Sequence, residues 1–310
     1  MDTLSHFGRP LLDLWQTLAG ALPGEWAQWR FMQLALLAVL LAAPLFALIG
    51  TQVVGLRLAF FSDTLGHAAL TGLALGVVAG LGSPLWAMLA WAVVQALLVT
   101  WVVRRSRAAS DTVLGVFMAL SVALGLALLS RPGHGGVQSY TGFLVGDVLS
   151  INARGLAALA LALLVTLALA GRWFNALALA GLNESLARSR GVKVAVVQTG
   201  FAIVVAIAVT LNIQWIGLLL VNAWLILPAA AARLLARNLR QYVLWTLAFS
   251  LTAGAGGLVS SYYWETATGA TIVLWAIGFF ALALMLRPWV AAEKVLAARA
   301  SDSPDAAPGS

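Results

Sequence analysis

Two residues that could bind a metal ion lie four positions apart in one apolar run. Asp63 and His67 occur in FFSDTLGHAALTGLALGVVAG, residues 60–80. On a helix this spacing places both side chains on one face, about 6 Å apart. A carboxylate within a membrane helix costs at least about 2.5 kcal/mol, so function or pairing must compensate. A carboxylate with an imidazole suits Zn²⁺, Mn²⁺ or Fe²⁺. We therefore expect a transient metal pathway; the alternative is hydrogen bonding of Asp63 to a neighbouring helix, with His67 a satisfied buried imidazole.

Three other residues are weaker candidates for the same pathway. Thr71 is expected to continue the Asp63–His67 stripe one turn further. His134 lies in the loop RPGHGGVQSY and could contact an arriving ion, although a loop histidine is more often solvated. Glu265 is expected at the external mouth or as a helix cap. Asn212, Gln214 and Asn222 are expected to form hydrogen bonds between helices.

Three glycines mark the opposite face of the Asp63 helix. Gly72, Gly76 and Gly80 are spaced four apart, and Gly72 lies half a turn away from Asp63. Small residues at this spacing let another helix approach closely. One face is thus predicted to pack against a helix, while the other presents polar groups to a cavity.

The composition places these residues in a membrane protein. Of 310 residues, 62% are hydrophobic and 9% charged, with a mean hydropathy of +0.96; a soluble domain has about 25% charged residues. The formal charge of +7 is dispersed between apolar runs, which argues against nucleic-acid binding. No cysteine is present, which excludes disulfides. P-loop, HExxH and GxSxG motifs are also missing, so we expect no enzyme activity and any ATP hydrolysis on a separate subunit.

Apolar stretches of about 20 residues predict an all-α, polytopic membrane bundle of eight or nine transmembrane helices surrounded by lipid. Pro228 suggests a kink or break in the seventh stretch. Residues 137–151 are too short to span and are expected to be re-entrant or interfacial. The predicted spans are 31–53, 58–80, 83–103, 111–130, 154–172, 194–212, 215–236, 241–260 and 268–286.

The basic residues predict the orientation, because they favour the cytoplasmic side. With nine spans, one orientation puts 14 of the 18 Lys and Arg residues inside, the N-terminus outside and the C-terminus in the cytoplasm. We divide the chain into an external surface segment at 1–30, a transmembrane domain at 31–287 and a partly disordered tail at 288–310. The 14 residues are Arg57, Arg104, Arg105, Arg107, Arg172, Arg188, Arg190, Lys193, Arg233, Arg237, Arg240, Arg287, Lys294 and Arg299.

A polar segment lies on the predicted cytoplasmic side between the fifth and sixth spans. Residues 174–193 are too polar to span, and LNESLARSRG reads as a short amphipathic helix closed by Gly191. Such a helix could lie at the headgroup level. Its length also suits docking to a cytoplasmic partner.

The order of these motifs resembles the membrane permeases of ABC importers for zinc, manganese and iron. The similarity runs from about Leu34 to Leu286. The pattern DTLxHAxLxG is closer to the zinc-type members. Five blocks carry the resemblance: FFSDTLGHAALTGLALG, DTVLGVFMALSVALGLALLS, ESLARSRGVKV, WIGLLLVNAWLILPAAAARLL and GLVSSYYWETATGATIVL.

The resemblance implies a fold like that of type II ABC importer permeases, in a bacterial inner membrane. It implies a homodimer, a cytoplasmic ABC ATPase and an extracytoplasmic metal-binding protein as partners, with no permanently bound cofactor. It also implies metal contact at Asp63 and His67. Contact with the ATPase is implied for Asn183, Glu184, Arg188 and Gly191.

The sequence departs from the family pattern at two places. Asn183 stands where an acidic residue is common, and Thr71–Gly72 stands where many members have Pro-Gly.

Two other functions are compatible with the sequence. One is an ABC permease for a chelate such as a siderophore or cobalamin. The other is a secondary transporter or channel in which Asp63 and His67 relay protons.

Overall fold

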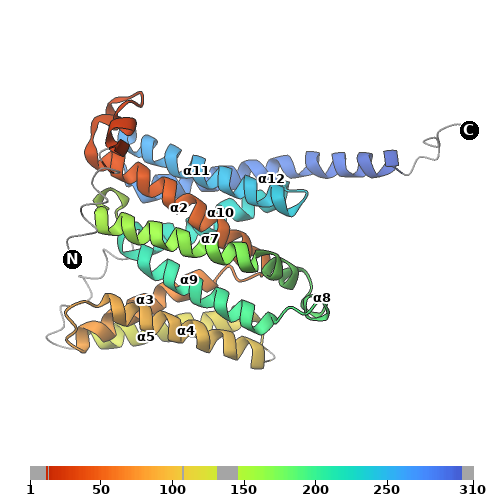
Figure 1. Cartoon of the computed structure of the whole chain (residues 1–310), viewed down its shortest axis with the longest axis horizontal. Coiled ribbons are helices and arrows are strands. Elements are labelled where there is room, and N and C mark those ends of the chain that lie inside the picture. Colours follow the sequence, from red (N-terminus) through yellow and green to blue (C-terminus); the bar gives the residue numbers. More distant parts are fainter. Residues whose placement is uncertain (1–11, 13, 107, 131–145, 302–310) are drawn as a thin grey trace, which may run out of the picture.

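The chain folds into a bundle of long helices in the computed structural model (Figure 1), which describes residues 12, 14–106, 108–130 and 146–301, and only the backbone of 289–301. Nine helices in this part of the chain are long and apolar enough to span a membrane, which confirms the predicted segments. They are α2 (Arg30–Gly55), α3 (Phe61–Val78), α4 (Leu85–Arg105), α5 (Ser110–Leu129), α7 (Ala153–Leu182), α9 (Val194–Ile216), α10 (Leu218–Leu235), α11 (Leu239–Trp264) and α12 (Thr268–Ser301).

Three short elements lie before or between these helices. They are the 3-10 helices η1 (Glu25–Gln28) and η3 (Val148–Ser150) and the helix α8 (Glu184–Ser189). Asparagine side chains cap three helix starts, since Asn152, Asn183 and Asn238 accept hydrogen bonds from backbone amides of α7, α8 and α11. The expected re-entrant stretch at 137–151 lies mostly outside the described residues.

The seventh span differs from the prediction at one proline and one glycine. The sequence suggested a kink or a break at Pro228; α10 continues through Pro228 as one helix, so the helix is not broken there. The chain turns instead at Gly217, a single residue between α9 and α10 with φ 86° and ψ 152°. Only glycine adopts such a conformation without strain, which explains why the break falls here.

The bundle has two chemically different ends. Arg104 at the end of α4 donates to Ala195 and Thr199 at the start of α9, and Arg233 at the end of α10 donates to the Val54 carbonyl near the end of α2. We call this end, which also carries α8 and lies to the right in Figure 1, the basic end. α9 starts at the basic end and, like α3, runs away from it. α10 runs toward the basic end, so α3 and α10 are antiparallel.

Close packing fixes α3 against α4, as two of the three glycines predict. A Cβ added to Gly72 would lie 2.6 Å from the Met88 Cα, and one added to Gly76 would lie 3.1 Å from the Pro84 Cα. Gly80 plays another part. It follows α3 with φ 67°, and its amide and that of Leu81 close the helix by donating to Val77 and Gly76.

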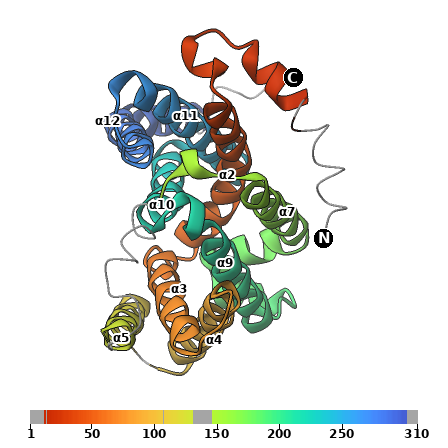
Figure 2. The ribbon, with the colours of Figure 1, turned by 90° about the vertical axis from the view of Figure 1, so that its left-hand side faces the viewer.

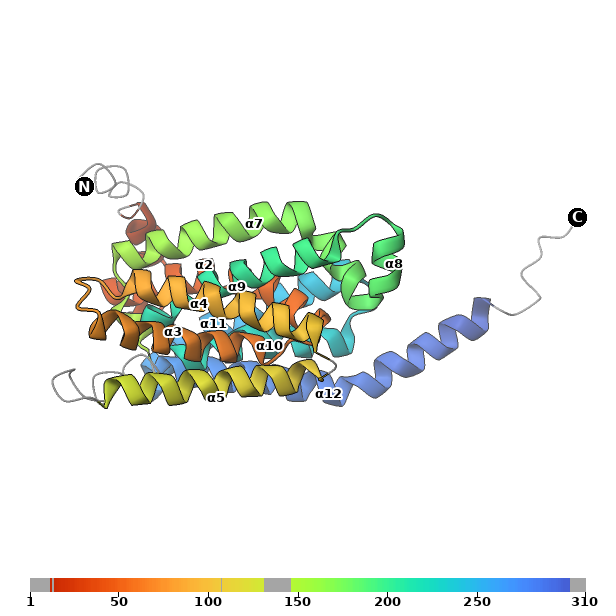
Figure 3. The ribbon, with the colours of Figure 1, turned by 90° about the horizontal axis from the view of Figure 1, so that it is seen from below.

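The last helix extends beyond the predicted domain boundary at residue 287. α12 continues from its membrane span through Pro288 to Ser301 and leaves the bundle at the basic end (Figure 3). Of the tail expected to be partly disordered, residues 302–310 lie outside the described residues. So do residues 1–11 and 13 of the N-terminal segment, in which residues 14–20 are helical.

Candidate functional site

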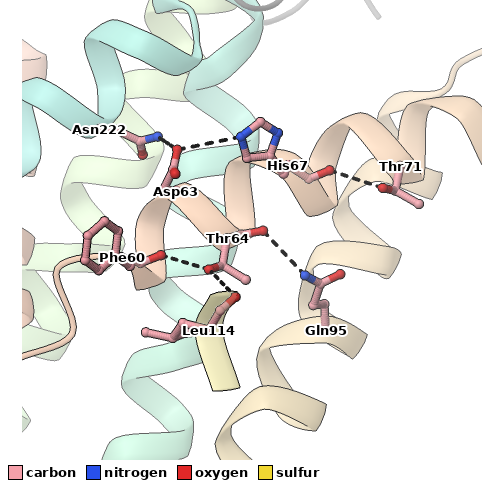
Figure 4. Close-up of polar contacts among 8 residues, drawn as sticks. All are labelled: Phe60, Asp63, Thr64, His67, Thr71, Gln95, Leu114 and Asn222. Carbon is pink, nitrogen blue, oxygen red and sulfur yellow. Dashed lines mark hydrogen bonds and ion pairs between the residues drawn. The ribbon is translucent and has the colours of Figure 1, made fainter. Parts of the chain in front are cut away.

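Asp63, His67 and Asn222 come together between α3 and α10 (Figure 4). The Asn222 amide Nδ2 donates to Asp63 Oδ1 at 2.6 Å, and His67 Nε2 lies 3.8 Å from the same oxygen. The side chains of Asp63 and His67 are 32% and 22% exposed. We call these three residues the polar trio. A carboxylate, an imidazole and an amide therefore converge where the protein leaves space beside them.

The start of α3 positions Asp63. Two backbone hydrogen bonds close the end of α2: Arg57, with φ 59°, donates to Val54, and Leu58 donates to Val53. α3 begins three residues later, and Asp63 falls in its first turn. The positive end of a helix dipole stabilises a carboxylate there. A tight, hydrogen-bonded turn thus fixes the backbone position of Asp63.

The polar trio lies deep in the bundle. Asp63 is 15 residues from the end of α3 at Val78, or about 22 Å at 1.5 Å per residue. Asn222 is 13 residues from the basic end of α10 at Leu235, or about 20 Å. Because a hydrocarbon core is about 30 Å thick, both distances place the trio near the middle of the membrane.

Hydrogen bonds hold the opposite side of α3 against α4 and α5. Gln95 of α4 donates to the Thr64 carbonyl at 3.4 Å and accepts from the Ser121 hydroxyl at 2.8 Å. Thr64 Oγ1 lies 3.2 Å from the Leu114 carbonyl of α5. These groups are buried, so each bond would be costly to lose. They fix the rotation of α3 and thereby the direction in which Asp63 and His67 point.

A family model described as the ABC 3 transport family matches residues 28–287 of this sequence. The chain belongs to that family. The match includes all nine predicted spans and the polar trio. As a member of the ABC 3 transport family, the chain is a membrane permease component of a transport system.

Individual relatives cover nearly the whole bundle. The high-affinity zinc uptake system membrane protein ZnuB of Haemophilus influenzae is 28% identical over 82% of this chain and 96% of its own length. The manganese transport system membrane protein MntC of Halalkalibacterium halodurans is 27% identical over 84% of this chain and 88% of its own. PsaBC from Streptococcus pneumoniae, solved with a Fab, has a similar chain at 25% identity, a TM-score of 0.73 and coverage of 86% and 96%.

Thr71 does not lie on the partly exposed face of α3 that carries Asp63 and His67. Its side chain is fully buried, and Oγ1 donates to the Ser121 carbonyl of α5 at 2.6 Å. Each step of four residues rotates a side chain by about 40°, so two steps turn Thr71 about 80° from Asp63. The expectation that Thr71 continues the stripe is wrong, and its hydroxyl joins the α3–α5 contact instead.

The remaining candidates do not meet the polar trio. His134 lies outside the described residues. Glu265 is exposed and ends α11 in a left-handed conformation with φ 52°. It lies opposite the basic end, near the start of α2, where Trp29 donates to the Tyr262 hydroxyl. Among the described residues, no group of three His, Cys, Asp or Glu side chains gathers as a metal cluster.

Of the predicted cytoplasmic segment at 174–193, residues 174–182 continue α7, and residues 184–189 form α8 at the basic end. Asn183 Oδ1 accepts from the Leu186 amide at 3.0 Å, and Glu184 pairs with Arg188 at 2.6 Å. Gly191, with φ 78°, ends the helix as predicted by donating to the Arg188 carbonyl. Ala187 is buried against the bundle, which leaves the Glu184–Arg188 pair exposed.

The sequence pointed to a hydrogen bond for Asn222 without linking it to Asp63. The two residues are 159 positions apart, so no local spacing relates them. The only local signal was a lone amide in the apolar run GLLLVNAWLIL. The hydrogen bond of Asp63 to a neighbouring helix, weighed as an alternative to metal contact, is therefore present in the structure.

Proposed function

We propose that this chain is the permease subunit of an ATP-driven importer of divalent transition-metal ions, with Zn²⁺ as the first candidate and Mn²⁺ or Fe²⁺ next. The observation that carries the proposal is the polar trio, a partly exposed carboxylate and imidazole held beside an amide near the membrane centre. Intramembrane ionisable residues commonly mark ion pathways. The zinc and manganese systems named for two relatives support the same substrate class.

The donor set suits a transient metal ligand site. Asp63 offers carboxylate oxygens and His67 a ring nitrogen, which are ligands for Zn²⁺, Mn²⁺ and Fe²⁺. Asn222 Oδ1 is buried without a hydrogen-bond partner, so it is a third oxygen free to accept. An ion entering the trio would replace the Asn222–Asp63 contact. A small set of ligands with one competing hydrogen bond favours release as well as binding, as transport requires.

A second copy of the chain would complete the pathway. In Figure 2, α12 and α5 lie at the edges of one side of the bundle, with α10 and α3 between them. The polar trio is partly exposed at the α3–α10 boundary, and lipid would be a costly neighbour for it. We therefore place the two-fold axis of a homodimer beside α3 and α10, with the ion path between the copies.

The ends of the bundle would face different partners. By the excess of Lys and Arg, the basic end faces the cytoplasm of a bacterial cell and the N-terminus lies outside. The exposed surface of α8, with Asn183, Glu184, Arg188 and Gly191, would dock on a separate ABC ATPase. An extracytoplasmic metal-binding protein would deliver the ion to the opposite end.

Uptake of radiolabelled zinc into proteoliposomes tests the proposal. The permease and its ATPase are reconstituted with binding protein and metal outside and ATP inside, and unlabelled manganese and iron compete. We expect ATP-dependent zinc uptake that is lost in Asp63→Ala and His67→Ala. Asp111→Asn, which alters a carboxylate in the first turn of α5, is the matched control.

Three results would contradict the proposal. Normal transport by Asp63→Ala or His67→Ala would show that the ion does not pass the polar trio. Zinc uptake by the permease alone, driven by a proton gradient, would show a secondary transporter. Competition by a siderophore or cobalamin, with no effect of free metal, would show a chelate permease.

A further inference from the structure

Two exposed apolar side chains flank the polar trio, one from each helix. Phe60, directly before α3, is 59% exposed, whereas the adjacent Phe61 is 2% exposed. Leu219 in the first turn of α10 is 65% exposed, although Leu218 and Leu220 on either side are buried. Each lies three residues before a member of the trio, Asp63 or Asn222. At this spacing side chains share one helix face.

The two side chains lie on opposite sides of the trio along the membrane normal. α3 starts on the basic side of the bundle and runs away from the basic end, while α10 runs toward it. Contacts fix this antiparallel register: Gly66 packs against Leu218, and Asp63 accepts from Asn222. Phe60, three residues before Asp63, therefore lies nearer the basic end than the trio. Leu219, three residues before Asn222, lies farther from the basic end than the trio.

The backbone that carries each side chain is anchored. The Phe60 carbonyl accepts from both the Thr64 amide and the Thr64 hydroxyl, at 3.0 and 2.9 Å. Figure 4 shows the Phe60 ring at the start of α3, one turn from Asp63. Leu218 fills the space above Gly66 and holds the first turn of α10 against α3. The backbone of both residues is thus fixed next to the trio, where the proposed second copy would face their side chains.

We propose that Phe60 and Leu219 are the two gates of the ion pathway. This inference rests on the proposed function. With their counterparts in a second copy, Phe60 closes the path on the basic side of the polar trio and Leu219 closes it on the opposite side. A narrow apolar constriction excludes water and therefore hydrated ions. Alternating access then requires only that α3 and α10 shift so that one pair separates while the other meets.

Metal retention in the proteoliposomes provides the first test. Vesicles preloaded with radiolabelled zinc are diluted into metal-free buffer without ATP, and the efflux rate is compared between variants. We expect that Phe60→Ala and Leu219→Ala each lower the zinc imported per ATP hydrolysed, and that Phe60→Ala/Leu219→Ala leaks about tenfold faster than wild type, since both constrictions are then widened. Replacing Phe60→Ala by Phe60→Leu in the double variant should restore zinc retention. Leu161→Ala, at a 60% exposed apolar position on α7, is the control.

The lack of cysteine in this chain allows a second test with single thiols. Phe60→Cys and Leu219→Cys complexes are treated with a membrane-impermeant thiol reagent from either side, with and without ATP trapped on the ATPase. We expect Phe60→Cys to react only from the ATPase side and Leu219→Cys only from the opposite side, with reactivities that change in opposite directions on trapping ATP.

The outcomes separate the gates from the proposed function. If wild type imports zinc and Asp63→Ala does not, while the double alanine variant retains zinc and couples ATP as wild type does, the gates are wrong and the proposed function stands. Labelling of both cysteines from the same side would also overturn the gates. If wild type transports no metal, the proposed function fails first, and the gate assignment fails with it.

Discussion

The two faces of α3 make opposite uses of the same 18-residue helix. The face toward α4 and α5, which we call the closed face, has two glycines in close contact with α4 and a buried network through Gln95. The face toward α10, the open face, carries Asp63 and His67, partly exposed. On the closed face, the polar groups of Gln95, Thr64 and Ser121 are hydrogen-bonded to one another or to α5, whereas across the open face Asn222 Oδ1 has no hydrogen-bond partner. Substitutions on the two faces should therefore fail in different ways, one in stability and the other in transport.

The largest effect is expected from filling the closed face at Gly72. In Gly72→Leu the new side chain would meet the Met88 backbone, so α4 would have to move. We expect a loss of about 3 kcal/mol or more, at the upper end of overpacking effects. Thermal unfolding of the detergent-solubilised protein, followed by fluorescence-detected size exclusion, measures it. Gly115→Leu, where a Cβ meets no atom within 4 Å, is the control, and equal losses in both variants would refute the packing argument.

On the open face, Asn222→Ala should impair transport and leave the fold intact. The substitution removes the hydrogen bond to Asp63 and the free oxygen, so zinc should bind more weakly. Loss of such a supporting group costs about tenfold or more in metal affinity. The KM for zinc uptake and the melting temperature are measured together. In the control Asn212→Ala, the lost amide bonds to Ala208 within its own helix, and KM should not change.

A smaller loss of stability is expected for Gln95→Leu. The change leaves the Ser121 hydroxyl and the Thr64 carbonyl without a partner from α4, which costs about 1–3 kcal/mol in a buried setting. Melting temperature is the measurement, and Thr252→Val, at an exposed hydroxyl on α11, is the control. A melting temperature equal to that of wild type would show that the closed face does not depend on this network.

The smallest effect on stability is expected at α8. Glu184→Gln breaks an ion pair whose side chains are 49% and 68% exposed, and surface pairs contribute about 0–1 kcal/mol. Ala187→Asp, at a fully buried position of the same helix, should be far more destabilising. If the two variants melted at the same temperature, α8 would not be held to the bundle through Ala187.

Local features of the sequence were enough to predict the nine spans and the Asp63–His67 pair. Apolar length defines a span, and spacing of four defines a helix face, so neither depends on distant residues. The partner of Asp63 depends on how α10 meets α3, which no local pattern records. The predicted position of Thr71 on the Asp63–His67 stripe was wrong because the helical rotation adds up over two steps of four residues. The helix break suggested at Pro228 is absent because a proline can remain inside a membrane helix.

The single-residue connection at Gly217 couples the positions of α9 and α10. α8 leads into α9 within a few residues at the basic end, and α9 then runs 23 residues, or about 35 Å, to Gly217. Leu219 and Asn222 follow two and five residues later. Residues 190–193 are the only non-helical stretch between α8 and α9, and Gly217 is the only residue between α9 and α10. If the proposed ATPase contact displaces α8, the short connection to α9 and the single glycine after it would carry that displacement to Asn222 near the middle of the membrane.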